Sequence, residues 1–319
     1  MLEHASTNQE AETIVIKIGT AALSAKDGGP DAKLLVTLVK EIAGLKHAGH
    51  RVIVVTSGAV GVGRKIARER EIKLEGFEET QQKQTAASWG QIRLMSLYEN
   101  LFAPYGITAA QVLTEKAHFT VNGDANKGIV ASFKRAMKHL LGFAKPNPNI
   151  VNFFNNILQL PNVIPIVNEN DTAAISELLC ADGKGFSDND ELAGLIAKTV
   201  GATRVIFLSS GHGVCRSGDD LSKQNVIPFI DFDDPGTLPY STDGKSDCGS
   251  GGMDSKLGIA KQLADKGILV YIASSREPGV IGKIMHGESV GTMLIYRLQK
   301  HIRPKWRVSS PSHTDELHR

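Results

Sequence analysis

Short apolar runs alternate with longer amphipathic stretches along most of this chain. The runs TIVIKI at residue 13 and RVIVVT at residue 51 are rich in β-branched residues, and the segment between them carries apolar residues at helical spacing. Strand, helix and strand repeated in this way build a parallel sheet with crossover helices packed on both of its faces. The pattern therefore predicts an α/β fold, an open and mainly parallel sheet sandwiched between helices in three layers, α/β/α.

The same alternation continues to residue 275. It predicts, in chain order, a glycine-rich turn after residue 56, a helix at 91–102, strands at 107–113 and 163–168, a helix at 190–200, a strand at 204–209, a helix at 254–266 and a strand at 268–275. Residues 118–149 have polar, turn-rich flanks around one basic amphipathic segment and are predicted to be an insertion. Residues 1–12 and 301–319 are polar and aperiodic, so we expect a flexible N-terminus and a disordered tail.

Composition argues against several classes of function. The 319 residues include 36 Lys and Arg against 34 Asp and Glu, a formal net charge of +2 with no long basic block, so nucleic acid is not expected as a partner. Cys180, Cys215 and Cys248 lack the spacing of a disulfide framework or a zinc site. No apolar run is long enough to cross a bilayer and the first residues lack a signal core, so we expect a cytoplasmic protein with no membrane partner.

Lys17 lies in the middle of an apolar run, where burial of an ammonium group needs a reason. One explanation is structural, because a lysine in an edge strand can pack its stem and keep its charge in water. The other is functional. Gly19 and Thr20 follow, and a cation beside exposed N–H groups at the carboxyl end of a parallel strand suits a phosphate. The short motif leaves both explanations open.

Loops at the carboxyl ends of the strands are the expected ligand site, since open α/β sheets bind ligands at that edge. They read IGTAA from residue 18, TSGAVGVG from residue 56, NENDTAA from residue 168, SSGHGV from residue 209 and CGSGGMDSKLGIA from residue 248. The last opens a helix with Lys256 one turn in, which offers N–H groups and positive charge to an anion. A glycine cluster alone is commonly an ordinary loop, but lysines in two such turns favour a phosphate site.

Taken in order, the motifs VIKIGT, VTSGAV, VNEND, SDNDELAGLIA, GSGGMDSKLGIA, REPGVIG and SVGTML resemble those of the amino-acid kinase family over residues 13–294. The resemblance implies one kinase domain over residues 13–300, with a substrate lobe at about 13–200 and a nucleotide lobe at about 201–300. It also implies transfer of a phosphoryl group from ATP, with Mg²⁺, to the γ-carboxylate of L-glutamate. The product, γ-glutamyl phosphate, is the first intermediate toward proline.

The resemblance also assigns roles to individual residues. Lys17 and Lys256 match the two lysines that the family sets on the transferring phosphoryl group, and Asp190 matches the aspartate that orients them. The positions that match glutamate-binding residues are Ser57, Gly58, Ala59, Asn168, Asp171, Asp188 and Asn189. The positions that match nucleotide-binding residues, besides the two lysines, are Gly19, Thr20, Ser209, Ser210, Gly249, Ser250, Gly251, Gly252 and Met253. No side chain is assigned to a metal ion.

The implied chemistry explains why this set contains no catalytic His or Ser. A glutamate carboxylate has a reference pKa of about 4.3 and is ionised at neutral pH, so it needs no general base. His212 is therefore expected to be a loop residue. The obstacle is the negative charge of the nucleotide, which two lysines and Mg²⁺ would offset. Two ammonium groups repel each other unless a carboxylate lies between them, which is the role expected of Asp190.

Two of these assignments also have structural alternatives. Asp190 could favour the dipole at the start of its helix, a role that is compatible with the catalytic one. The segment NEND could be only a turn and a helix cap. Within the full motif set we expect substrate contact, with Asp171 facing the α-ammonium group of glutamate and Asn168 supplying hydrogen bonds.

The chain departs from the family pattern at several places. Ser209 and Ser210 stand where the family has Thr-Asp, which puts the adenine and ribose contacts and the choice of nucleotide in question. We expect no C-terminal RNA-binding-like domain and no reductase domain, because the sequence ends shortly after Leu294. The insertion at 118–149 is longer than the usual connection and adjoins the region that the family uses for subunit contact and feedback control.

The resemblance further implies a homo-oligomer, feedback inhibition by proline and a glutamyl-phosphate reductase that receives the product. Two other functions remain open. One is a kinase for a related acid such as N-acetylglutamate or aspartate, although an acidic residue near the α-amino group is useful only if that amine is charged. The other is a non-catalytic amino-acid sensor, which the Ser209 and Ser210 departure favours and the retained lysines oppose.

Overall fold

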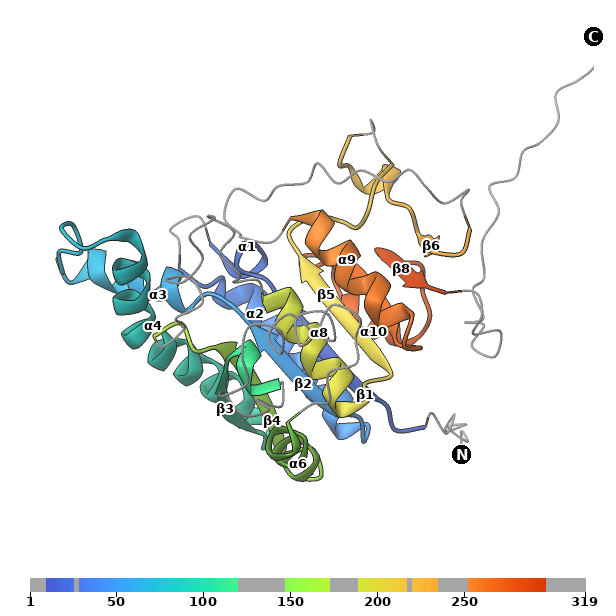
Figure 1. The fold of residues 1–319 in the computed structure, drawn as a ribbon, viewed down its shortest axis with the longest axis horizontal. Coiled ribbons are helices and arrows are strands. Elements are labelled where there is room, and N and C mark those ends of the chain that lie inside the picture. Colours follow the sequence, from blue (N-terminus) through green and yellow to red (C-terminus); the bar gives the residue numbers. More distant parts are fainter. Residues whose placement is uncertain are drawn as a thin grey trace, which may run out of the picture.

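One twisted sheet runs through the molecule with helices on both of its faces (Figure 1). The computed structural model describes residues 10–25, 29–119, 147–172, 189–216, 220–234 and 252–296. Within these residues eight strands lie in the order β3-β4-β2-β1-β5-β7-β8-β6. Their bounds are β1 Thr13–Ile18, β2 Arg51–Thr56, β3 Thr108–Thr114, β4 Val163–Glu169, β5 Arg204–Ser209, β6 Phe229–Asp231, β7 Leu269–Ser274 and β8 Thr292–Ile295. Neighbouring strands are parallel except β7 and β8, which confirms the predicted open, mainly parallel α/β sheet.

Strand β1 lies in the interior of the sheet. It pairs in parallel with β2 on one side and with β5 on the other, and Lys17 lies opposite Val55 and Phe207. All six residues of β1 are buried. The structural explanation of Lys17, as an edge residue that keeps its charge in water, is therefore wrong.

Helices cover both faces of the sheet (Figure 1). Their bounds are α1 Thr20–Leu23, α2 Ala32–His47, α3 Ala59–Glu69, α4 Glu79–Phe102, α6 Pro148–Ile157, α8 Asn189–Val200, α9 Met253–Ala264 and α10 Val280–Met285. Ile14, Ile16 and Ile18 of β1 pack in one core with α2, α4 and α10. Val15 packs in the opposite core with α6, α8 and α9. Because side chains alternate along a strand, Lys17 shares the face of Val15 and lies on the side that α8 and α9 cover.

Several element predictions need correction. Helix α4 begins at Glu79 rather than residue 91, and a capping box between Glu78 and Gln81 starts it. The glycine-rich segment after β2, predicted as a turn, contains helix α3. Helix α6 begins at Pro148, inside the range predicted as an insertion, of which residues 120–146 lie outside the described residues. The elements β6, α10 and β8 were not expected from the sequence.

The chain ends that are predicted to be flexible and disordered lie mostly outside the described residues, which begin at residue 10 and end at residue 296. Glu12 is nevertheless held in the fold. Its Oε1 lies 3.0 Å from Nη2 of Arg204, and its backbone N–H donates to Nδ1 of His50. In the described part of the chain, no helix combines the length and the apolar character needed to span a membrane.

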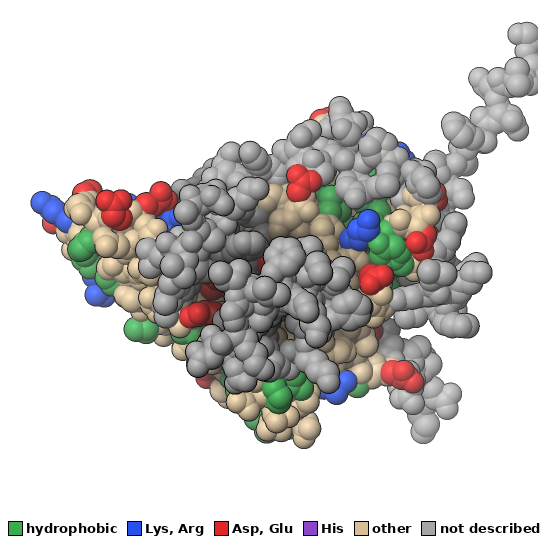
Figure 2. Space-filling model, viewed as in Figure 1, with side chains coloured by type: hydrophobic (Ala, Val, Ile, Leu, Met, Phe, Trp, Pro, Cys, Tyr) green, Lys and Arg blue, Asp and Glu red, His purple; other side chains and the backbone are tan. Residues whose placement is uncertain are grey.

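The described surface mixes apolar and charged side chains. On the face shown in Figure 2, hydrophobic side chains are scattered, and both acidic and basic side chains lie at the end formed by α3 and α4. Large exposed hydrophobic residues such as Phe77, Ile92 and Leu221 are far apart in the sequence. Single exposed apolar side chains are normal on folded proteins.

Candidate active site

Three charged side chains from three elements meet at the carboxyl edge of the sheet. Nζ of Lys17, in β1, lies 2.5 Å from Oδ1 of Asp190, and Nζ of Lys256, in α9, lies 2.9 Å from Oδ2 of the same carboxylate. Asp190 is in the first turn of α8 and its side chain is fully buried. The structure thus brings together the three residues predicted to be catalytic, with one carboxylate oxygen facing each lysine.

The two lysines keep Asp190 ionised. Burial alone would raise the pKa of its carboxyl group, but the charges of Lys17 and Lys256 and their hydrogen bonds outweigh burial and lower the pKa below its ordinary value of 3.8. Two ammonium groups and one carboxylate leave the cluster with a net positive charge, which suits an anionic ligand. The start of α8 also favours a carboxylate, so the helix-dipole explanation and the charge-pairing explanation of Asp190 act together.

The turn after Lys17 leaves room beside its ammonium group. Gly19 donates its backbone N–H to the carbonyl oxygen of Leu208 at 3.2 Å, which joins the end of β1 to β5. Thr20 follows as the first residue of α1. A Cβ atom at Gly19 would lie 3.4 Å from Nζ of Lys17. Glycine at this position therefore lets a ligand approach the lysine closely.

A group of uncharged polar side chains lies beside the charged residues. Nδ2 of Asn189 donates to Oγ of Ser57 at 2.7 Å, to the carbonyl oxygen of Thr56 at 2.9 Å and to Oδ1 of Asn168 at 3.1 Å. Ser57 follows β2, Asn168 lies near the end of β4 and Asn189 opens α8. Three residues predicted to bind the amino acid therefore meet at the ends of two neighbouring strands.

Gln91 of α4 belongs to the same group, although no sequence motif contained it. Its Oε1 accepts from Nδ2 of Asn168 at 2.8 Å, and Gln91 is only 7% exposed. The available signal was a polar residue on an apolar helix face, since the residues three, seven and eleven positions further on are all buried: Leu94, Tyr98 and Phe102. Hydrogen bonds thus join four residues into an amide cluster: Ser57, Gln91, Asn168 and Asn189.

The other residues predicted to bind the amino acid lie at the start of α3, in the turn after β4 and outside the described residues. Gly58 has a φ of 107°, which glycine adopts readily, and it precedes Ala59, the first residue of α3. Asp171 is in the turn after β4 and is half-buried. Asp188 lies outside the described residues. In the segment NEND, Asn168 joins the amide cluster and Asp171 sits in a turn, and contact of either residue with a substrate stays a prediction.

The described residues predicted to bind the nucleotide lie at the same edge of the sheet. Gly252 precedes α9 and Met253 is its first residue, so Lys256 is in the first turn of that helix. Ser209 ends β5, and the exposed Ser210 follows it. The rest of the predicted glycine-rich turn lies outside the described residues: Gly249, Ser250 and Gly251.

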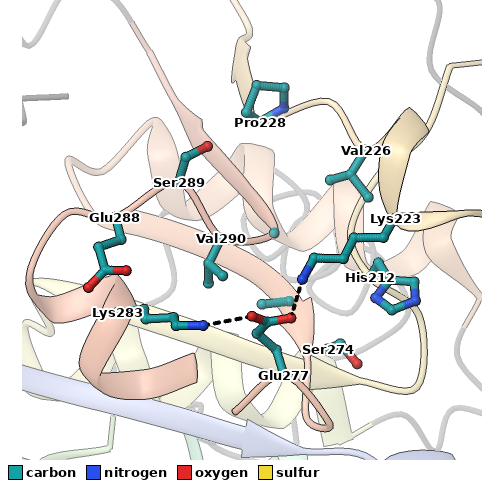
Figure 3. Close-up of a pocket in the computed structure, with 12 residues that line it drawn as sticks. His212, Lys223, Val226, Pro228, Ser274, Glu277, Lys283, Glu288, Ser289 and Val290 are labelled. Carbon is teal, nitrogen blue, oxygen red and sulfur yellow. Dashed lines mark hydrogen bonds and ion pairs between the residues drawn. The ribbon is translucent and has the colours of Figure 1, made fainter. Parts of the chain in front are cut away.

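A pocket of about 210 Å³ lies next to the ends of β5 and β7 (Figure 3). Its lining includes Ser274, the last residue of β7, and His212, which lies in the loop after β5 as expected. Nζ of Lys223 and Nζ of Lys283 donate to the two carboxylate oxygens of Glu277, at 2.6 and 2.7 Å. These hydrogen bonds lower the pKa of Glu277 to about 2, so its carboxylate is ionised at neutral pH.

Clusters of metal-ligating side chains are absent from the described residues. In the described ranges, no three carboxylate, His or Cys side chains gather closely enough to hold a metal ion. Both oxygens of Asp190 face lysines instead.

Curated relatives match nearly the whole chain. A glutamate 5-kinase of Chlorobaculum tepidum is 38% identical over 297 residues, covering 92% of this chain and 72% of the relative. A glutamate 5-kinase of Nitratidesulfovibrio vulgaris strain Hildenborough is 32% identical over 309 residues, covering 97% and 70%. A glutamate 5-kinase of Escherichia coli O139:H28 is 31% identical over 285 residues, covering 89% and 69%. The chain therefore spans about 70% of the length of these relatives.

Solved structures with low sequence identity share the fold. A UMP kinase of Bacillus anthracis superimposes with a TM-score of 0.51 at 16% identity, covering 90% of this chain and 97% of that one. An N-acetylglutamate synthase of Neisseria gonorrhoeae, complexed with coenzyme A and L-arginine, superimposes with a TM-score of 0.53 at 13% identity, covering 89% and 61%. The model of the amino acid kinase family matches residues 12–274, which include both the charged residues at the sheet edge and the amide cluster. The chain belongs to the amino acid kinase family.

Proposed function

We propose that the chain transfers the γ-phosphoryl group of ATP to the γ-carboxylate of L-glutamate, giving γ-glutamyl phosphate and ADP. The observation that carries this proposal is the junction between two groups of side chains. Asn189 belongs to the amide cluster, and the next residue, Asp190, binds Lys17 and Lys256. One group suits an amino acid and the other a phosphoryl group. The shared name of the relatives supports glutamate as the acceptor.

In this mechanism the γ-carboxylate of glutamate is the nucleophile. Its ordinary pKa of about 4.3 leaves it ionised at neutral pH, so no general base is needed. The main barrier is repulsion between this carboxylate and the phosphates. Lys17 and Lys256 place two ammonium groups where negative charge spreads over the transferring phosphoryl group, and Asp190 fixes both before the substrates bind.

The amide cluster and Asp171 hold the amino acid. Ser57 and Asn189 come from different elements and are bonded at 2.7 Å, so the cluster offers a rigid polar wall at the ends of β2 and β4. Asp171, after β4, faces the α-ammonium group. Holding the carboxylate in line with the phosphoryl group makes the reaction effectively unimolecular, which is a large part of catalysis in phosphoryl transfer.

The nucleotide binds on the β5 and β7 side of the charged residues. The pocket lined by His212 and Ser274 accepts its base and ribose. Strand β7 is two strands away from β1, roughly 10 Å at the usual strand spacing, so the phosphates extend from this pocket toward Lys17. The start of α9 and Lys256 lie on the same path. Mg²⁺, if bound with the nucleotide, would offset part of the negative charge of the phosphates.

The reaction is the first step of proline biosynthesis in this proposal and takes place in the cytoplasm. Its product is a labile acyl phosphate, so a glutamyl-phosphate reductase that consumes it is the expected partner. Proline acts as a feedback inhibitor and the protein is a homo-oligomer. The motif resemblance and the name of the relatives support these assignments.

A coupled assay of ADP release, with hydroxylamine present to trap acyl phosphate as a hydroxamate, tests the proposal. L-Glutamate, L-aspartate and N-acetylglutamate are compared as acceptors. We expect ADP and hydroxamate in equal amounts with glutamate and much slower turnover with the other two. Faster turnover with aspartate or N-acetylglutamate would indicate a kinase for that acid. A non-catalytic sensor would bind glutamate in calorimetry and would release no ADP with any of the three acceptors.

A further inference from the structure

The hydrogen bonds of the amide cluster leave two atoms over. Oδ1 of Asn168 accepts from Nδ2 of Asn189 and from the backbone N–H of Glu169, and Nδ2 of Asn168 donates to Gln91. Within the described residues, Nε2 of Gln91 and Oδ1 of Asn189 are buried without a hydrogen-bond partner. Buried polar atoms in folded proteins are nearly always hydrogen-bonded, so these two need an explanation.

The direction of these amides is fixed by the backbone. A backbone N–H can only donate, so the atom of Asn168 that faces the N–H of Glu169 at 3.0 Å must be its oxygen. The other end of the Asn168 amide is then the donor, and it meets Oε1 of Gln91 at 2.8 Å. Nε2 of Gln91 is consequently the atom that has no acceptor in the described residues.

Close helix packing fixes the position of Gln91. A Cβ atom at the preceding residue, Gly90, would lie 1.9 Å from the carbonyl oxygen of Ala59, and one at Gly63 would lie 1.9 Å from the carbonyl oxygen of Ala86. Helices α3 and α4 therefore touch backbone to backbone, which only glycine permits. This contact holds Gln91 against the start of α3. Gly58 and Ala59, which are predicted to bind the amino acid, lie at that helix start.

An α-amino acid matches the two leftover atoms, because it carries a carboxylate and an ammonium group on one carbon. We propose that Gln91 is a specificity-determining residue of the amino-acid site, with its Nε2–H donating to the α-carboxylate of the acceptor. Oδ1 of Asn189 accepts from the α-ammonium group of the same molecule, beside Asp171. The inference rests on the proposed function for the identity of the acceptor, and it adds a contact that the motifs did not include.

The experiment compares two acceptors and three variants. L-Glutamate and its α-amide, in which a carboxamide replaces the α-carboxylate, are used with wild type, Gln91→Glu, Gln91→Met and the control Gln82→Glu. A glutamate at position 91 keeps an acceptor for Asn168 but presents an oxygen to the substrate. Gln82 lies nine residues earlier in α4, on the opposite face of the helix, and donates to the carbonyl oxygen of Phe77.

We expect Gln91→Glu to raise the KM for L-glutamate at least about tenfold with the KM for ATP unchanged, since that factor is what loss of one charge-assisted hydrogen bond produces. The preference of this variant for L-glutamate over the α-amide should fall by at least about tenfold or reverse. The carboxylate at position 91 repels the α-carboxylate of glutamate, whereas it accepts a hydrogen bond from the carboxamide of the α-amide. Gln91→Met should also raise the KM for glutamate, but it should reduce the preference for L-glutamate over the α-amide less than Gln91→Glu does. The control Gln82→Glu should match wild type.

An unchanged preference between the two acceptors in both Gln91 variants would overturn the inference, even if both KM values rose, because a structural role affects both acceptors alike. If Gln91→Glu fails to fold, the preference of Gln91→Met decides. Calorimetric Kd values for the two amino acids separate this inference from the proposed function. If wild type forms no acyl phosphate, the proposed function fails, and the change in Kd preference at position 91 still decides the role of Gln91.

Discussion

Asn189 and Asp190 are consecutive residues at the start of α8, and their side chains join different groups. Asn189 donates to Ser57 and to Asn168, whereas Asp190 lies between the ammonium groups of two lysines. Successive side chains on a helix point about 100° apart, so one helix start can hold both groups in a fixed relation. A site that aligns an amino acid with a phosphoryl group needs such a relation.

Replacing Lys17 tests the charged residues. Lys17→Met keeps the length of the side chain and removes its charge, so kcat should fall by roughly a hundredfold or more with little change in glutamate binding. Steady-state kinetics and calorimetry measure the two effects. Lys83→Met, which removes one partner of an exposed pair with Glu79, is the control. A kcat close to that of wild type would show that Lys17 is only structural.

Asp190 should stabilise the fold in a pH-dependent way. Folding lowers the pKa of Asp190 below 3.8, so its carboxylate contributes stability at every pH above that value and loses the contribution as the pH falls through the lowered pKa. Asp190→Asn should therefore lower the free energy of unfolding by similar amounts at pH 7 and pH 5, by about 3 kcal/mol or more, since the buried ammonium group of Lys17 and the largely buried one of Lys256 lose the carboxylate between them. The loss should begin to shrink as the pH falls below 3.8, where the unfolded chain takes up the proton before the folded one does.

Urea unfolding at each pH measures this loss. Asp265→Asn is the control, because Asp265 is exposed and its Oδ2 lies 3.9 Å from Nζ of the exposed Lys266. The same loss at pH 3 and pH 7 would contradict a lowered pKa of Asp190.

Asp171 should distinguish free glutamate from its acetylated form. Asp171→Asn keeps the shape of the side chain and removes its charge, so the KM for glutamate should rise at least about tenfold while the KM for ATP stays the same. The gap between glutamate and N-acetylglutamate should narrow, because the acetylated amine carries no charge. Loss of ATP affinity with an unchanged KM for glutamate would mean that the substrate and nucleotide lobes are assigned the wrong way round.

A substitution in the pocket at the ends of β5 and β7 should change the KM for ATP and leave the KM for glutamate unchanged. Glu277→Gln removes the carboxylate that binds Lys223 and Lys283, so the shape and charge of the pocket change. We expect the KM for ATP to rise by about three- to tenfold, equivalent to about 1 kcal/mol, with the KM for glutamate unchanged. Glu79→Gln, on the exposed surface of α4, is the matched control. A change in the KM for glutamate alone would contradict the assignment of this pocket to the nucleotide.

The sequence predicted six of the eight strands in the described residues, because the signals for those six are local. Strand β5 was predicted with its observed bounds, residues 204–209, since an apolar run bounded by polar residues leaves little choice. Helix α3 was predicted as a turn because it contains Gly61 and Gly63, and glycine ordinarily weakens a helix. Gly63 is there for a tertiary reason, the close approach of α4, which no local pattern reveals.

The site was only partly predictable for a similar reason. The motifs named Lys17, Asp190 and Lys256, but the contact of both lysines with one carboxylate depends on how α8 and α9 pack on β1. Gln91 lies 77 residues from Asn168 in the sequence, so their hydrogen bond could not be expected from spacing. The central position of β1 likewise became clear only from strand order.

The most direct test of the central claim follows one oxygen atom. L-Glutamate labelled with ¹⁸O in its γ-carboxylate is incubated with ATP, Mg²⁺, hydroxylamine and the protein. If the γ-carboxylate attacks the phosphoryl group, its oxygen becomes the bridge of the acyl phosphate, and hydroxylamine then expels it with the phosphate. Mass spectrometry should find one ¹⁸O atom in each released phosphate, in an amount equal to the hydroxamate. Unlabelled phosphate formed together with ADP would contradict the account, because it would show transfer of the phosphoryl group to water.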